Sequence, residues 1–98
     1  MQLLAEEVGK RLLLQHHKLA CAESCTGGWI SKVLTDIAGS SDWFDRGFVT
    51  YSNNAKMAAL GVRQETLTAQ GAVSEATVRE MATGAVSHSE ANLAVAVS

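Results

Sequence analysis

Side chains that could act as nucleophiles gather in one short stretch, residues 22–29, with the sequence AESCTGGW. Ser24 and Cys25 supply a hydroxyl and a thiol, while Gly27 and Gly28 would let a ligand approach the backbone closely. If a strand ends before this stretch and a helix begins after it, the free N–H groups favour a phosphate or an oxyanion. A plain helix cap explains the residues equally well, because short Gly/Ser turns are common and neither a Walker loop nor GxGxxG is present.

Either nucleophile needs a base, and the sequence offers two kinds. A helix start favours a thiolate at Cys25, but the histidines that could assist it stand where solvated helix ends are expected: His16, His17 and His88. A serine can instead use a lysine whose amine burial keeps neutral. Lys56 is the candidate, since it lies in the first turn of an expected helix, where the dipole disfavours a positive charge. A surface lysine fits the same position, so both interpretations stay open.

Hydrophobic periodicity and turn residues predict the elements that would position these groups. The expected order is a helix over 2–15, a strand over 18–22, a helix over 29–37, a turn over 38–42, a strand over 48–51, a helix capped by Asn53 or Asn54 and ending at Leu60, a helical turn within 63–71, a helix capped by Ser74, and a strand over 93–97. The last strand is a continuous apolar run, typical of a central strand buried on both faces. Alternation of helices and strands predicts a layered α/β fold.

Composition limits the partners. The 98 residues suit a single domain over 1–98, and a net charge of −2 provides no basic field for nucleic acid. No apolar run approaches the ~20 residues of a membrane span. Cys21 and Cys25 are the only cysteines, so neither a disulfide framework nor a metal site is expected. A cytoplasmic location is the simplest prediction. The chain also ends directly after an expected central strand, where ligands bind in such sheets, which predicts a fold truncated after its third strand.

Five motifs in order resemble the C-terminal domain of the CinA competence/damage-inducible proteins, whose stand-alone forms are nicotinamide-nucleotide amidases. They are AESCTGG at 22–28, TDIAGSS at 35–41, GFVTYSN at 47–53 followed by Lys56, LGV at 60–62 and GAVSE at 71–75. The resemblance runs over nearly the whole chain. It implies a three-layer α/β/α sandwich and a cytoplasmic enzyme of pyridine nucleotide recycling. Such an enzyme hydrolyses the carboxamide of nicotinamide mononucleotide to nicotinate mononucleotide and ammonia.

The resemblance also implies roles for particular residues. Ser24 becomes the nucleophile, Lys56 its base, and Tyr51 a nearby group that orients or relays the proton. Backbone N–H groups around Cys25, Thr26 and Gly27 would hold either the oxyanion or the substrate phosphate, and the sequence does not choose between them. Further polar or close contacts to the substrate are expected from Glu23, Gly28, Ser41, Ser52 and Asn53. No metal or cofactor is implied.

The chain departs from the family in one respect. Members continue after the strand over 93–97 into a glycine-rich Gly-Ile-Ala-Gly-Pro loop, further strands and a helix, none of which is in this sequence. An exposed sheet edge invites pairing with another chain, so a homo-oligomer is expected. Two alternatives stay open. One is an inactive nucleotide-binding or assembly module of the same fold, and the other is an amidase that uses Cys25.

Overall fold

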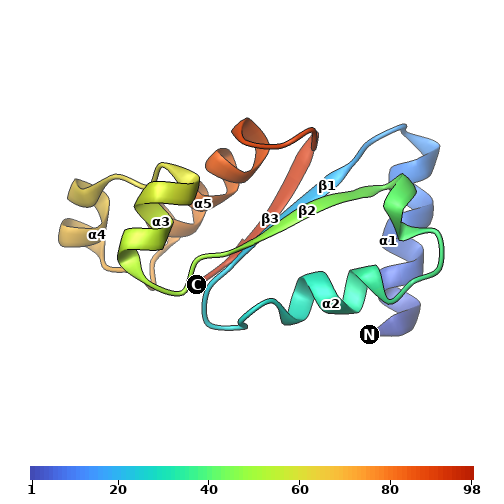
Figure 1. The fold of residues 1–98 in the computed structure, drawn as a ribbon, viewed down its shortest axis with the longest axis horizontal. Coiled ribbons are helices and arrows are strands. Elements are labelled where there is room, and N and C mark those ends of the chain that lie inside the picture. Colours follow the sequence, from blue (N-terminus) through green and yellow to red (C-terminus); the bar gives the residue numbers. More distant parts are fainter.

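One parallel sheet of three strands organises the chain. The computed structural model describes residues 1–98 and places β1 (Leu19–Glu23) between β2 (Phe44–Val49) and β3 (Leu93–Val97). All pairs are parallel, so the carboxyl ends of the strands meet at one edge of the sheet (Figure 1). Consequently the turn over 24–28 and the segment over 50–52, which follow β1 and β2, lie next to each other.

Helices cover both faces of this sheet. The helices are α1 (Gln2–Leu14), α2 (Trp29–Thr35), α3 (Asn53–Leu60), α4 (Gln64–Gln70) and α5 (Glu75–Ser87), with a short 3-10 helix, η1 (Ser40–Asp42), before β2. α1 and α2 pack on one face, while α3 and α5 pack on the other and α4 lies against α5 (Figure 1). The α/β/α arrangement predicted from the sequence is confirmed. No helix combines the length and apolar character that crossing a bilayer requires.

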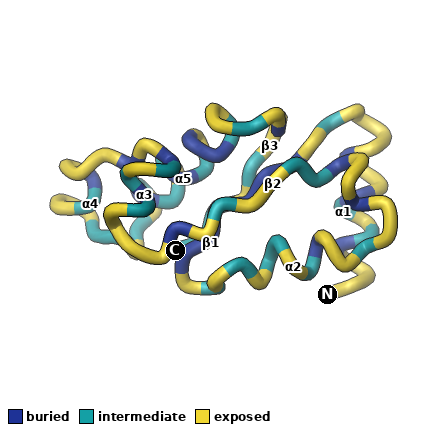
Figure 2. The backbone as a smooth tube through the Cα atoms, in the orientation of Figure 1, coloured by how far each residue is buried: buried dark blue, intermediate teal, exposed yellow.

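Side-chain alternation along β1 builds two separate apolar clusters. The cluster on the α3 and α5 side includes Ala20, Ala22, Leu60 and Met81. The cluster on the α1 and α2 side includes Leu19, Cys21, Leu34 and Trp43. Because successive strand side chains point to opposite faces, Glu23 points toward α2 and Ser24 toward α3. Every residue of β1 is buried, whereas Figure 2 shows exposed positions on the helices, in the loops and along β2.

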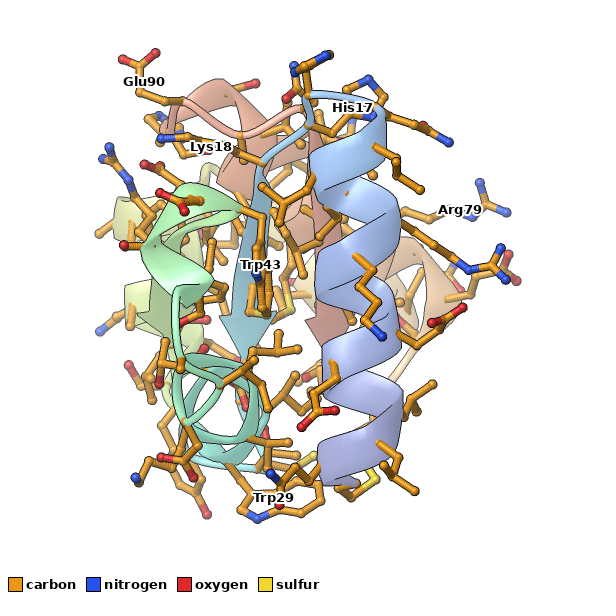
Figure 3. All side chains as sticks on the ribbon, turned by 90° about the vertical axis from the view of Figure 1, so that its right-hand side faces the viewer. His17, Lys18, Trp29, Trp43, Arg79 and Glu90 are labelled. Carbon is orange, nitrogen blue, oxygen red and sulfur yellow. The ribbon has the colours of Figure 1, made fainter.

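Trp43 sets the distance between α1 and the segment that enters β2. Its ring is almost fully buried, and Figure 3 shows it lying against α1. A Cβ atom at Gly9 would be only 2.6 Å from Trp43 Cε2. Glycine at this position of α1 is therefore a packing requirement.

Two strand predictions were wrong in part. β2 occupies Phe44–Val49 instead of 48–51, because its register with β1 runs from Leu19–Phe44 to Glu23–Val49 and ends where β1 ends. Pairing with β1 thus outweighs the strand preference of Thr50 and Tyr51. β3 is an edge strand with exposed side chains, not a central strand buried on both faces.

Helix ends follow local chemistry and were predicted well. Ser74 Oγ accepts a hydrogen bond from Thr77 N–H (3.1 Å), as expected of the residue that caps α5. Gly61 ends α3 with a φ of 71°, a left-handed conformation that glycine adopts without strain. The N-cap of α3 is Ser52, one residue before the predicted asparagines, and its hydroxyl accepts from Ala55 N–H (3.0 Å).

Candidate active site

Ser24 and Lys56 meet at the carboxyl edge of the sheet. Ser24 follows β1 directly, and Lys56 is the fourth residue of α3, whose start follows β2. The Lys56 Nζ atom lies 3.0 Å from Ser24 Oγ. Only 1% of Lys56 and 7% of Ser24 are exposed, so the contact is buried. A hydroxyl and an amine that are 32 positions apart in the sequence are therefore brought together in a largely dry environment.

The other neighbours of Lys56 are neutral. Its Nζ atom also lies 3.1 Å from the carbonyl oxygen of Thr50 and 3.4 Å from that of Tyr51. None of the ion pairs in the structure includes Lys56. A neutral amine has two N–H groups and one lone pair. The two carbonyls can accept the N–H groups, which leaves the lone pair to accept the Ser24 hydroxyl proton.

Burial lowers the pKa of Lys56, because removal from water disfavours the ammonium form. The electrostatic interaction with Cys25 acts in the opposite direction and is smaller. With no carboxylate to hold the charge, the site favours the neutral amine more than solvent does. This is the protonation state that a general base requires.

Glu23 lies on the opposite side of the strand end and is 0% exposed. Its Oε1 atom accepts hydrogen bonds from Thr26 Oγ1 (2.7 Å) and Ile30 N–H (2.8 Å). Its Oε2 atom accepts from Ser31 N–H (2.8 Å) and Ser31 Oγ (2.6 Å). Burial acts to raise the pKa of Glu23, but these hydrogen bonds outweigh it and lower the pKa. The carboxylate therefore anchors α2 from within, in place of the substrate contact predicted from the sequence.

The turn over 24–28 leaves some backbone donors free. Gly27 N–H donates to the Ser24 carbonyl (3.0 Å), whereas the N–H groups of Cys25, Thr26 and Gly28 donate to no acceptor in the protein. Gly28 has a φ of 102°, and a Cβ atom there would be 3.2 Å from Val49 Cγ2. The free N–H groups of the two residues after Ser24 are suited to hold an oxygen that gains negative charge.

The remaining predicted residues differ in position. Tyr51 is 74% exposed, and its hydrogen bond with Lys56 is made by the backbone carbonyl. Cys25 is exposed in the turn, and Asn53 is exposed at the start of α3, after the Ser52 cap. Ser41 belongs to η1, at the amino end of β2, so the structure places it at the opposite edge of the sheet from Ser24 (Figure 1). The expected substrate contact from Ser41 is corrected accordingly.

Sequence reasoning missed two residues near this edge. Thr50 is 2% exposed, and its hydroxyl has no hydrogen-bond partner. It comes directly after the Glu23–Val49 pair, so it lies opposite Ser24 and on the same face. Ser31 supplies half of the hydrogen bonds to Glu23. Only correct bounds for β2 would have indicated Thr50, since the face of each strand residue follows from them.

The donor set at this edge does not suggest a metal centre. No group of three or more His, Cys, Asp and Glu side chains converges anywhere in the structure. The amine, the hydroxyls and the free N–H groups instead suit a reaction in which a serine oxygen attacks a carbonyl carbon.

Comparison with known proteins identifies the relatives of this chain. A family model described as the CinA C-terminal domain matches residues 1–98. The nicotinamide-nucleotide amidohydrolase PncC of Escherichia coli K12 is 58% identical over 95 residues, which are 97% of this chain and 58% of that protein. A CinA-like protein of Chloroherpeton thalassium is 53% identical over 92 residues, which are 94% of this chain and 22% of that protein.

Solved structures of related proteins share the fold of this chain. The competence/damage-inducible protein CihA of Agrobacterium tumefaciens superposes with a TM-score of 0.94 and 52% identity, covering 97% of this chain and 58% of that one. The competence damage-inducible protein A of Klebsiella pneumoniae has a TM-score of 0.97 and 42% identity, covering 99% of this chain and 60% of that one. The chain thus spans less than two thirds of the length of these relatives.

Proposed function

We propose that this chain, which belongs to the CinA C-terminal domain family, hydrolyses the carboxamide of nicotinamide mononucleotide to nicotinate mononucleotide and ammonia. The observation that carries the proposal is the buried 3.0 Å contact between Ser24 Oγ and Lys56 Nζ. Its support from relatives is the 58% identity to a protein named nicotinamide-nucleotide amidohydrolase. The role in pyridine nucleotide recycling that the family resemblance implies is part of this proposal.

The first half of the proposed reaction transfers the acyl group to the protein. The Lys56 lone pair accepts the Ser24 proton as Oγ bonds to the carboxamide carbon, and the carbonyl electron pair moves onto its oxygen. The N–H groups of Cys25 and Thr26 hold this oxyanion. The C–N bond then breaks, and ammonia leaves with the proton from Lys56, so an ester on Ser24 remains.

The second half returns Ser24 to its starting state. Lys56 takes a proton from water as the water oxygen attacks the ester carbon. The bond between that carbon and Ser24 Oγ breaks, and the proton passes from Lys56 to Oγ. The sum is one carboxamide and one water consumed, with one carboxylic acid and one ammonia formed. Lys56 thus acts as the base twice, first toward the Ser24 hydroxyl and then toward water.

Substitution of either nucleophile tests the assignment. We expect Ser24→Ala to lower ammonia release from nicotinamide mononucleotide by at least about 10³-fold, because the acyl ester can no longer form. Cys25→Ala should leave it within about threefold, since the amine contacts the hydroxyl of Ser24 and not the thiol. The matched pair separates a serine enzyme from a cysteine enzyme.

Three results would contradict the proposal. Loss of activity in the Cys25→Ala variant alone would assign the reaction to the thiol. No ammonia from the unchanged chain, with the nucleotide nevertheless bound, would favour a binding module over an enzyme. Ammonia release that survives Ser24→Ala would place the reaction elsewhere in the protein.

A cytoplasmic location and self-association through the sheet edge stay predictions.

A further inference from the structure

The start of α2 is already occupied by an anion that belongs to the chain. N–H groups at a helix start commonly bind phosphate, since they point outward and the helix dipole favours negative charge there. In this structure the N–H groups of Ile30 and Ser31 both donate to Glu23, at 2.8 Å each. The carboxylate reaches them from β1, the strand that precedes the helix, and it is wholly buried.

A substrate phosphate cannot share this position. It would have to displace two backbone hydrogen bonds and stand beside a buried carboxylate that has no cation to offset it. The hydroxyl groups of Thr26 and Ser31 also donate to the carboxylate, so neither is free to donate to a phosphate. Phosphate is therefore disfavoured at the start of α2, and the buried negative charge of Glu23 also disfavours it at the neighbouring turn.

The same hydrogen bonds fix the turn on both sides of the free donors. Thr26 Oγ1 ties the middle of the turn to Glu23, and Ile30 N–H ties the first turn of α2 to the same atom. Ser24 N–H donates to the Val97 carbonyl (3.1 Å), which holds the other end. Between these anchors the N–H groups of Cys25 and Thr26 have no partner, so their direction is set by the anchored segments around them.

We infer that Glu23 is a positioning residue for the reaction. Its carboxylate closes the start of α2 to the substrate phosphate and keeps the N–H groups of Cys25 and Thr26 directed at the acyl oxygen. This inference rests on the proposed function for the identity of the substrate. The N–H groups of the turn then bind the carbonyl end of the substrate, and other groups bind the phosphate end.

Glu23→Gln is the direct test. Glutamine keeps the size of the side chain and one acceptor oxygen, but its NH2 group faces two donors where Oε2 now accepts from Ser31 N–H and Ser31 Oγ. The matched control is Glu80→Gln. Glu80 accepts from Arg63 N–H (2.9 Å) and from the Thr66 hydroxyl at the start of α4, and it contacts neither Ser24 nor Lys56.

The first readout needs no nucleotide. A small fluorophosphonate labels an activated serine as Oγ bonds to phosphorus, fluoride leaves and Lys56 takes the hydroxyl proton. The phosphoryl oxygen then needs the same N–H groups as an acyl oxygen. We expect labelling of Ser24, followed by mass, to slow at least about tenfold in Glu23→Gln and to stay within about twofold in Glu80→Gln. The pH at half-maximal rate should not move, because the base is Lys56 in every variant.

The second readout uses nicotinamide mononucleotide. We expect Glu23→Gln to lower kcat at least about tenfold and to leave KM within about twofold, since the phosphate is bound elsewhere. Should Glu23→Gln fail to fold, Thr26→Val removes one of the four hydrogen bonds without touching the charge. That variant should slow labelling by about twofold to fivefold.

Several outcomes would overturn the inference. They are equal labelling rates in Glu23→Gln and the unchanged chain, an equal loss in Glu80→Gln, a shifted pH midpoint, a raised KM at constant kcat, or no labelling of Ser24 in the unchanged chain. Failure of the proposed function looks different. The unchanged chain would then label at Ser24 but release no ammonia, and the comparison of the two glutamine variants would still decide the role of Glu23.

Discussion

Two consecutive residues at the end of β1 meet opposite surroundings. Glu23 points toward α2, where its four hydrogen bonds satisfy the carboxylate. Ser24 points toward α3, where it contacts a lysine without a counter-ion, and where the Thr50 hydroxyl has no partner. Both sets of polar groups are buried. On the Glu23 face the hydrogen bonds of the buried carboxylate are complete. On the Ser24 face the buried amine has no counter-ion and a buried hydroxyl has no hydrogen-bond partner.

From this difference we expect a structural role for the Glu23 face and a chemical role for the Ser24 face. A buried charge stabilises a fold only when its surroundings satisfy it, as they do at Glu23. A buried amine with only carbonyl and hydroxyl partners lowers stability, and the proposed function assigns it the role of a base. We therefore expect the largest loss of activity from substitutions on the Ser24 face and the largest loss of stability from substitutions on the Glu23 face.

The largest effect is expected at Lys56. Lys56→Met should lower ammonia release by at least about 10³-fold, because no other base touches Ser24. The free energy of unfolding, from urea denaturation, should stay within about 1 kcal/mol or rise, since an apolar chain of similar length removes a buried amine. A large loss of stability would mean that the amine serves the fold.

The next effect is expected at Glu23, in stability. Glu23→Leu leaves the donors of Thr26, Ile30 and Ser31 without an acceptor in the protein interior. The free energy of unfolding should fall by about 3 kcal/mol, as found when one partner of a buried charged network is removed. Glu80→Leu provides the comparison, and equal stability of Glu23→Leu and the unchanged chain would refute the anchoring role.

A smaller effect is expected at Thr50. Thr50→Val deletes a hydroxyl that bonds to nothing in the structure, so unfolding should not become easier. If the hydroxyl serves the reaction at the neighbouring Ser24, kcat should fall about tenfold, and Thr50→Ser should restore it. A valine variant with full activity would show that the unpaired hydroxyl has no part in catalysis.

The smallest effects are expected from pH, and they have the same sign on the two faces but lie in different pH windows. The pKa of Lys56 is lowered, so the unfolded chain binds more protons between the folded pKa and the ordinary one near 10.5. The free energy of unfolding of the unchanged chain should therefore rise with pH in that window, relative to Lys56→Met. This difference also cancels the buried Cys21 thiol, whose pKa burial raises to about 11.

The pKa of Glu23 is lowered too, so the free energy of unfolding again rises with pH, now in the acid range. Its stabilisation is complete above the ordinary pKa near 4.5 and is lost as pH falls through the lower folded value. Acid unfolding of the unchanged chain should thus approach that of Glu23→Gln as pH decreases. Parallel curves for the two proteins over the whole acid range would contradict the assignment.

Features with local causes were predictable from the sequence. The caps at Ser74 and Gly61 depend on hydrogen bonds and φ values within a few residues, and the amphipathic helices depend on a short apolar period. The pairing of Ser24 with Lys56 was proposed through resemblance to a known family, and the structure places these atoms in contact. Spacing alone had left a capped turn as an equal alternative and had favoured a surface lysine at position 56.

Only the tertiary structure decided the register between β1 and β2 and the sheet face to which each side chain points. The sequence by itself determined the layered α/β order and the residue types at the carboxyl edge, because these follow from local periodicity and chemistry. Pairing between β1 and β2 moved β2 toward the amino terminus, excluded Ser41 from the site and placed Thr50 opposite Ser24. It also turned Glu23 toward α2 and away from Lys56, since side chains of neighbouring strand residues point to opposite faces. A shift of one residue would exchange those faces, and no local signal in the sequence reports that shift.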